Sequence, residues 1–208
     1  MNEHPEIINQ NISANLSLTP DDHIQWVSPL NDDDFAEYRD QEFIDMLGLE
    51  LNKQQLNSFW PTLGPAWDGL AKTTSGNAIL IEAKSHIPEL VSVPSSASPN
   101  SLVKIHESLD EVKRFLKGHE HLDWASCFYQ YTNRLAHLYF LRELNNISAY
   151  LAFVCFVNDT EMEGPKTEAE WKGAIYLLES FLGIHGHRLS PYVFHLYIDV
   201  SQLKQEGL

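Results

Sequence analysis

The run "ISAYLAFVCFV" at residues 147–157 constrains the fold of this 208-residue chain more than any other stretch. It joins β-branched, aromatic and small apolar side chains without a charge, which is typical of a strand buried within a sheet. A shorter apolar run opens "NAILIEAK" at 77–84, and "PYVFHLYIDV" at 191–200 is a further strand candidate. These runs predict a sheet with a hydrophobic core.

Helical patterns separate these strand candidates. The predicted helices cover about 101–118, 123–145 with Asp123 as N-cap, and 167–182, which opens at the capping-box pair Thr167 and Glu170. An earlier helix is expected within 32–49, and Ser75-Gly76-Asn77 is turn material between two short strands. The order predicts an α/β fold, a central mixed β-sheet with a β-meander, flanked by helices.

The first thirty residues are polar and poorly periodic. We expect residues 1–30 to be an N-terminal arm or tail, with a short extended piece at "HIQWVSPL", and 31–208 to form one domain. Residues 1–50 hold 12 of the 29 acids and one base, Arg39, so this quarter carries −11 of the net charge of −15. The acidity of the chain is therefore mainly regional.

The overall composition limits the class of protein. No apolar run approaches the roughly 20 residues that span a bilayer, and the start of the chain lacks a signal-peptide pattern, so we expect a cytoplasmic protein without a membrane partner. The net charge of −15 disfavours nucleic acid as a partner, because phosphate binding requires clustered Lys and Arg. A nucleic-acid function therefore needs a specific motif to support it.

Such a motif lies at the end of the strand predicted over 77–84. Side chains alternate between the faces of a strand, so Glu82, Lys84 and His86 share one face with Leu80. Neighbours on one face are about 6.6 Å apart, close enough for Glu82 and Lys84 to reach one small ion or phosphate. A same-face salt bridge is the simpler interpretation of this pair.

Asp68 makes the pair more specific. It precedes the apolar run that pairs through the Ser75–Asn77 turn, so the hairpin places Asp68 near Glu82. Two carboxylates this close repel each other unless a cation lies between them. On this basis, we expect Glu82→Ala to raise the melting temperature in the absence of metal.

Asp68, a gap of thirteen residues, and then Glu82-Ala83-Lys84 resemble the D-x(n)-(D/E)-x-K signature of the PD-(D/E)xK nuclease superfamily, although Ala66 and Trp67 separate Pro65 from Asp68. The resemblance covers about residues 35–160 and implies a restriction endonuclease-like fold. It also implies that Asp68, Glu82 and the Ala83 carbonyl bind Mg²⁺ or Mn²⁺, and that Lys84 activates the attacking water.

The helix predicted over 123–145 supplies supporting groups. Its apolar stripe is Trp124, Phe128, Tyr131, Leu135 and Leu138, and its polar stripe is Gln130, Asn133, Arg134 and His137. Relatives of phage exonucleases within the superfamily carry a Gln on the corresponding helix in a Q-x(3)-Y pattern, which Gln130 matches and Arg134 does not. The resemblance therefore makes Gln130 a catalytic candidate.

The other polar groups are candidate substrate contacts or additional ligands. Asn133, Arg134 and His86 are expected to bind substrate, because amide, guanidinium and imidazole groups hydrogen-bond to phosphate. Glu37 and Glu42 have the pattern of surface acids, and Glu42, beside an apolar Phe43, is the favoured one as an additional metal ligand.

Two functions follow from these features. The first is a Mg²⁺-dependent nuclease that hydrolyses phosphodiester bonds, with DNA favoured over RNA, and a homodimer formed through "FHLYIDV" is one arrangement that the sequence allows. The second is a non-catalytic protein of the same fold that acts in interaction or regulation through its acidic N-terminal segment. A basic groove near Asp68 would favour the first, and its absence the second.

Overall fold

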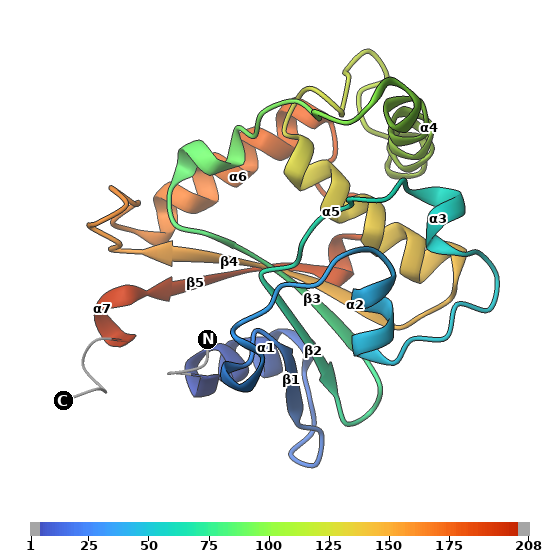
Figure 1. Cartoon of the computed structure of the whole chain (residues 1–208). Coiled ribbons are helices and arrows are strands. Elements are labelled where there is room, and N and C mark those ends of the chain that lie inside the picture. Colours follow the sequence, from blue (N-terminus) through green and yellow to red (C-terminus); the bar gives the residue numbers. More distant parts are fainter. Residues whose placement is uncertain (1–4, 204–208) are drawn as a thin grey trace.

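A computed structural model describes residues 5–203, which form an α/β fold around a five-stranded mixed sheet (Figure 1). The strands follow the order β1 (Ile24–Ser28), β2 (Gly69–Thr73), β3 (Ala78–Lys84), β4 (Ala149–Val157) and β5 (Val193–Asp199). Strand β2 pairs antiparallel with both β1 and β3, whereas β4 pairs parallel with both β3 and β5. The predicted mixed sheet flanked by helices is therefore confirmed.

Helices cover the two faces of the sheet unequally (Figure 1). One face carries α2 (Asp40–Leu47), α3 (Leu56–Phe59), α4 (Pro99–Leu116), α5 (Tyr129–Tyr139) and α6 (Glu168–Leu182), and the other carries α1 (Pro5–Leu16). A π-helical turn at Phe140–Leu144 continues α5, and the short α7 (Val200–Leu203) follows β5. Within residues 5–203, every helix is too short or too polar to cross a membrane.

The N-terminal segment belongs to the packed fold. Ile8 and Ile12 of α1 are buried against the sheet, and Asn9 Oδ1 accepts a 2.8 Å hydrogen bond from Trp26 Nε1 of β1. Strand β1 pairs with β2, which confirms the extended piece predicted at 23–30. An arm or tail was predicted for residues 1–30, but within residues 5–30 the structure has a helix that buries Ile8 and Ile12 against the sheet, despite the polar average of the segment.

Two helices begin later than their acidic residues predict. Helix α2 starts at Asp40 rather than near Asp32, because Asp34 and Phe35 have left-handed backbone angles, with φ of 47° and 57°. Helix α5 starts at Tyr129 rather than after Asp123, and the preceding Phe128 has φ of 52°. In both segments, left-handed residues interrupt the helical hydrogen-bond series.

The β2–β3 hairpin is confirmed at the predicted turn. Thr73 N–H donates to Asn77 O at 2.9 Å, and Gly76 adopts a φ of 92°, which glycine tolerates. The three antiparallel strands do not form a simple meander, however, because α2 and α3 lie between β1 and β2 in the chain. Strand β5, which contains most of "FHLYIDV", lies at one edge of the sheet.

Candidate active site

A cleft of about 480 Å³ opens where β3 ends, between the segment before β2 and the N-terminal half of α5. Seven residues predicted from the sequence line it: Asp68, Glu82, Ala83, Lys84, Gln130, Asn133 and Arg134. They come from three elements that are far apart in the sequence. The fold therefore gathers most of the predicted site residues around one cavity.

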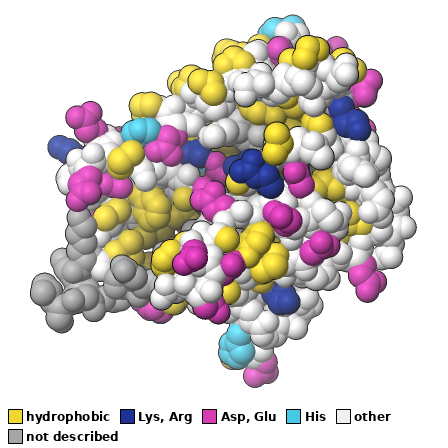
Figure 2. Space-filling view, viewed as in Figure 1, with side chains coloured by type: hydrophobic (Ala, Val, Ile, Leu, Met, Phe, Trp, Pro, Cys, Tyr) yellow, Lys and Arg dark blue, Asp and Glu magenta, His cyan; other side chains and the backbone are white. Residues whose placement is uncertain are grey.

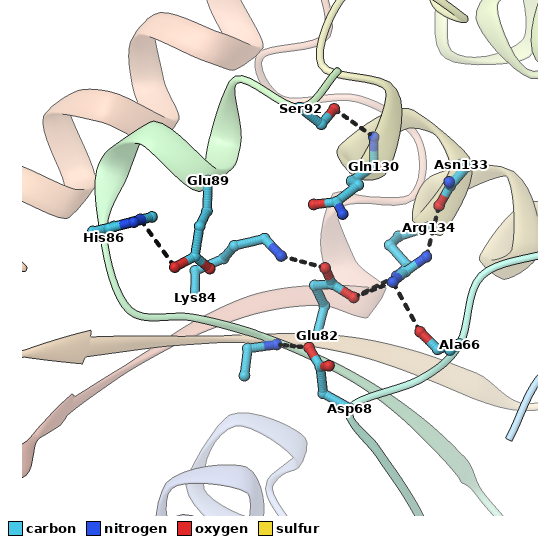
Figure 3. A network of polar contacts seen from close by, with 11 residues as sticks. Ala66, Asp68, Glu82, Lys84, His86, Glu89, Ser92, Gln130, Asn133 and Arg134 are labelled. Atoms are coloured by element: carbon cyan, nitrogen blue, oxygen red, sulfur yellow. Dashed lines mark hydrogen bonds and ion pairs between the residues drawn. The ribbon is translucent and has the colours of Figure 1, made fainter. Parts of the chain in front are cut away.

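The two carboxylates approach each other across the hairpin. Gly69 pairs with Ile81, so the preceding Asp68 lies across from Glu82 on the same face of the sheet. Asp68 Oδ2 accepts a hydrogen bond of 2.6 Å from Ala83 N–H, which fixes this carboxylate at the strand end (Figure 3). Burial, followed by the nearby charge of Glu82, raises the pKa of Asp68 to about 6.

Glu82 is buried between two cations. Its side chain is almost inaccessible, and its Oε1 pairs with Lys84 Nζ. Its Oε2 accepts a hydrogen bond of 2.5 Å from Arg134 Nε and forms an ion pair with Arg134 Nη2, also at 2.5 Å (Figure 3). The simpler sequence interpretation, a same-face salt bridge between Glu82 and Lys84, is therefore present, extended by an arginine from α5.

The predicted polar stripe of α5 faces the cleft and the core instead of solvent. Gln130 is exposed within the cleft, and its backbone N–H donates to Ser92 Oγ at 2.9 Å. Asn133 and Arg134 are buried in the cleft wall. Figure 3 shows the Gln130 amide directed towards the Glu82 and Lys84 pair.

His137, the fourth residue of the stripe, has a structural position. It is fully buried among Phe43, Trp60 and Trp67, with ring centroids 5.0–6.2 Å from its own. Its Nδ1 lies 2.8 Å from Asn133 O, and burial lowers its pKa to about 4. We conclude that His137 is a neutral packing residue that links α5 to the segment before β2.

The apolar stripe of α5 packs largely as predicted. Tyr131 stacks on Phe153 of β4 with ring centroids 4.7 Å apart, and its hydroxyl donates to Glu179 of α6 at 2.8 Å. Leu135 is fully buried in the core on this face. Phe128 instead contacts Phe181 of α6, because its left-handed backbone turns it away from the helical stripe.

His86 differs from the other predicted site residues. It lies beyond the end of β3, outside the lining of the cleft, and its Nδ1 pairs with Glu89 Oε1 at 2.9 Å. Figure 3 shows the imidazole on the far side of Lys84 from Arg134. The strand ends before His86, so the alternation that placed it with Glu82 no longer applies there.

The remaining residues of the cleft differ in part from the expectation. Of the two acids considered as an additional metal ligand, Glu37 lines the cleft and the favoured Glu42 does not. Glu89 and the Ser92–Ser96 stretch also line it, and the sequence did not indicate them. The late start of α2 explains the first error, because Glu37 belongs to the loop before that helix. The Ser- and Pro-rich composition of 92–101 marked a loop but gave no indication of where it would fold.

The charges around the cleft are more acidic than basic. Its lining contains four acids, Glu37, Asp68, Glu82 and Glu89, against two bases, Lys84 and Arg134. On the face shown in Figure 2, Lys and Arg side chains are few and lie among acidic ones. Among the described residues that line the cleft, there is thus no row of basic side chains of the kind that follows a nucleic-acid backbone.

The donors fit a hard divalent cation with few protein ligands. Mg²⁺ is commonly held by one or two carboxylates, with water and substrate phosphate completing its shell, and Asp68 and Glu82 supply such a pair. Within residues 5–203, no group of three or more His, Cys, Asp or Glu side chains is arranged to hold a metal. A magnesium site here would therefore depend on Asp68 and Glu82, with Lys84 and Arg134 as competing cations.

Comparisons of this chain with family models, with curated proteins and with solved structures find no match. The residues of the cleft are therefore the basis for a function of this chain.

Proposed function

We propose that this protein is a Mg²⁺- or Mn²⁺-dependent phosphodiesterase of the restriction endonuclease-like class, acting on nucleic acid with DNA favoured over RNA. One observation carries the proposal: the carboxylates of Asp68 and Glu82 converge from neighbouring strands in one cleft, with Lys84 on the same face. The charge of Glu82 contributes to the raised pKa of Asp68, so a cation shared by the two groups would be favourable.

Asp68 and Glu82 would hold the metal ion, which would supply positive charge to a phosphate oxygen and favour ionisation of a water. Lys84 is the general acid–base and electrostatic group of this proposal, because its ammonium lies against Glu82 within the cleft. Gln130 would orient the water or phosphate through its amide. Asn133 and Arg134 border the same space and would bind phosphate oxygens.

The test is metal-dependent cleavage of single- and double-stranded DNA and RNA by the wild type and Lys84→Ala. We expect cleavage by the wild type with Mg²⁺ or Mn²⁺, and a loss of about 10²–10⁴-fold in the variant. Lys72→Ala, which removes a lysine from β2 outside the cleft lining, is the matched control and should cleave like the wild type. Equal cleavage by all three proteins, or none by the wild type with either metal, would contradict the proposal.

A second candidate function is a non-catalytic interaction or regulatory protein of the same fold. Two observations favour it: Glu82 already has two cationic partners, and acids outnumber bases around the cleft. A partner with basic groups would complement this surface better than a polyanion would. Absence of cleavage by the wild type, together with Mg²⁺-independent capture of a basic peptide, would support this function.

A further inference from the structure

Arg134 connects α5 to β3, which carries Glu82, and to the segment before β2, which carries Asp68. Two of its nitrogens bind Glu82 Oε2 at 2.5 Å, and Nη2 also donates to Ala66 O at 2.9 Å, two residues before Asp68. Nη1 donates to Asn133 Oδ1 at 2.9 Å, and the guanidinium carbon lies 4.9 Å from the centre of the Trp67 ring. Arg134 is thus held on several sides while only 6% exposed.

Four charged side chains, Asp68, Glu82, Lys84 and Arg134, form the floor of the cleft, and their charges cancel. With Asp68 and Glu82 ionised, their two negative charges equal the two positive charges of Lys84 and Arg134. Solvent screens the other acids of the lining more strongly, because Glu37 is exposed and the Glu89 side chain, which contacts His86 Nδ1, is 29% exposed. A dication placed alone on this floor would therefore have no net negative charge to offset its own.

We propose that Arg134 is a built-in counter-cation that couples metal binding to phosphate binding, so that the cleft takes a divalent ion together with an anionic phosphodiester. The phosphate would supply negative charge that the floor lacks, and a guanidinium released from Glu82 would find a bidentate partner in the phosphate oxygens. Arg134 is in this sense a positioning residue. The inference rests on the proposed function, because it assumes that Asp68 and Glu82 bind the metal.

Reciprocity makes the coupling measurable without catalysis. If phosphate strengthens metal binding, the metal must strengthen phosphate binding by the same factor. The experiment is calorimetric titration of Mn²⁺ into the full chain, with and without an excess of dimethyl phosphate, a simple phosphodiester monoanion. For the wild type, we expect dimethyl phosphate to increase Mn²⁺ affinity by about tenfold or more. This comparison uses the wild type alone, so it does not depend on whether any variant folds.

Variants test the role of Arg134. Arg134→Gln removes one positive charge from the floor, so it should bind Mn²⁺ alone about tenfold more tightly than the wild type, and dimethyl phosphate should add little. Arg134→Lys keeps the charge and should bind Mn²⁺ alone as weakly as the wild type. Arg142→Gln is the matched control, because Arg142 is also a partly buried arginine that donates to a backbone carbonyl and stacks on Tyr192, outside the cleft lining.

The outcomes separate this inference from the proposed function. If Mn²⁺ binds, Glu82→Gln abolishes its binding, and neither dimethyl phosphate nor Arg134→Gln changes the affinity, then the counter-cation role is wrong while the metal site stands. If no Mn²⁺ binds to the wild type or to Arg134→Gln, with or without dimethyl phosphate, both the inference and the proposed function fail.

Discussion

The two faces of the sheet bury different kinds of side chain. The face under α1 is closed mainly by apolar side chains, including Ile8, Ile12 and Ile81, and its polar contact is the hydrogen bond between neutral Asn9 and Trp26. The face under α5 also buries charges, among them Glu82 and Arg134. Strand β3 contributes to both, since its residues alternate between them. Burying charged side chains costs desolvation free energy, and a face that serves only as a scaffold does not need them. The buried charges under α5 therefore mark this face as the candidate functional face.

The largest expected effect on stability comes from breaking the charged cluster. Glu82→Ala leaves Lys84 and Arg134 buried without their carboxylate, so we expect the free energy of unfolding to fall by about 4 kcal/mol. This replaces the sequence-based expectation of a higher melting temperature, which considered only repulsion from Asp68. Chemical denaturation measures the change, and a loss below about 1 kcal/mol would show that the cluster is not desolvated as the structure indicates.

A cavity on the scaffold face should cost slightly less and leave the cleft intact. Ile12 is fully buried between α1 and the sheet, so Ile12→Ala should lower the free energy of unfolding by about 3 kcal/mol. Mn²⁺ affinity at fixed temperature should not change. A neutral result in denaturation would mean that α1 does not contribute to the folded core, and Ile7→Ala, at a partly buried position of the same helix, provides the comparison.

Removing the charge of Asp68 should stabilise the metal-free protein at neutral pH. The pKa of Asp68 in the folded state is about 6, above its ordinary value of 3.8. Between pH 3.8 and pH 6, the folded state therefore binds more protons than the unfolded state does. Stability due to this group is therefore lost as pH rises from about 4 to above 6. We expect Asp68→Asn to be about 2 kcal/mol more stable than the wild type at pH 8 and equal to it at pH 4.

Thermal unfolding across this pH range, without divalent metal, provides the measurement for Asp68. Asp45→Asn, which changes an exposed aspartate of α2, serves as the control for net charge. A difference between Asp68→Asn and the wild type that stays constant with pH would contradict the assigned pKa.

The smallest effect on stability is expected at Gln130, which tests whether a cleft residue can be removed without disturbing the fold. Its side chain is exposed in the cleft, so Gln130→Ala should change the free energy of unfolding by less than about 0.5 kcal/mol. Under the proposed function, cleavage should nevertheless fall by about tenfold or more. A large loss of stability would instead make Gln130 part of the scaffold.

The sequence predicted much of the core because its signals were local. The uncharged run at 149–157 became β4, the turn residues around Gly76 formed the hairpin, and the Thr167–Glu170 capping box starts α6. The failures were at places where distant contacts decide the structure. Helix α1 is stabilised by the sheet rather than by its own composition, and left-handed residues at Asp34 and Phe128 delay α2 and α5.

The sequence by itself determined which groups could meet at the cleft. The alternation of β3 placed Glu82 and Lys84 on one face, and the hairpin turn placed Asp68 opposite Glu82. Only the tertiary structure decided how their charges are compensated. Arg134 lies 52 residues from Glu82, and the docking of α5 against the sheet, which no local pattern specifies, brings its guanidinium onto the carboxylate. Electrostatic energy depends on distances in space and on burial, so the state of these carboxylates follows from the packed fold.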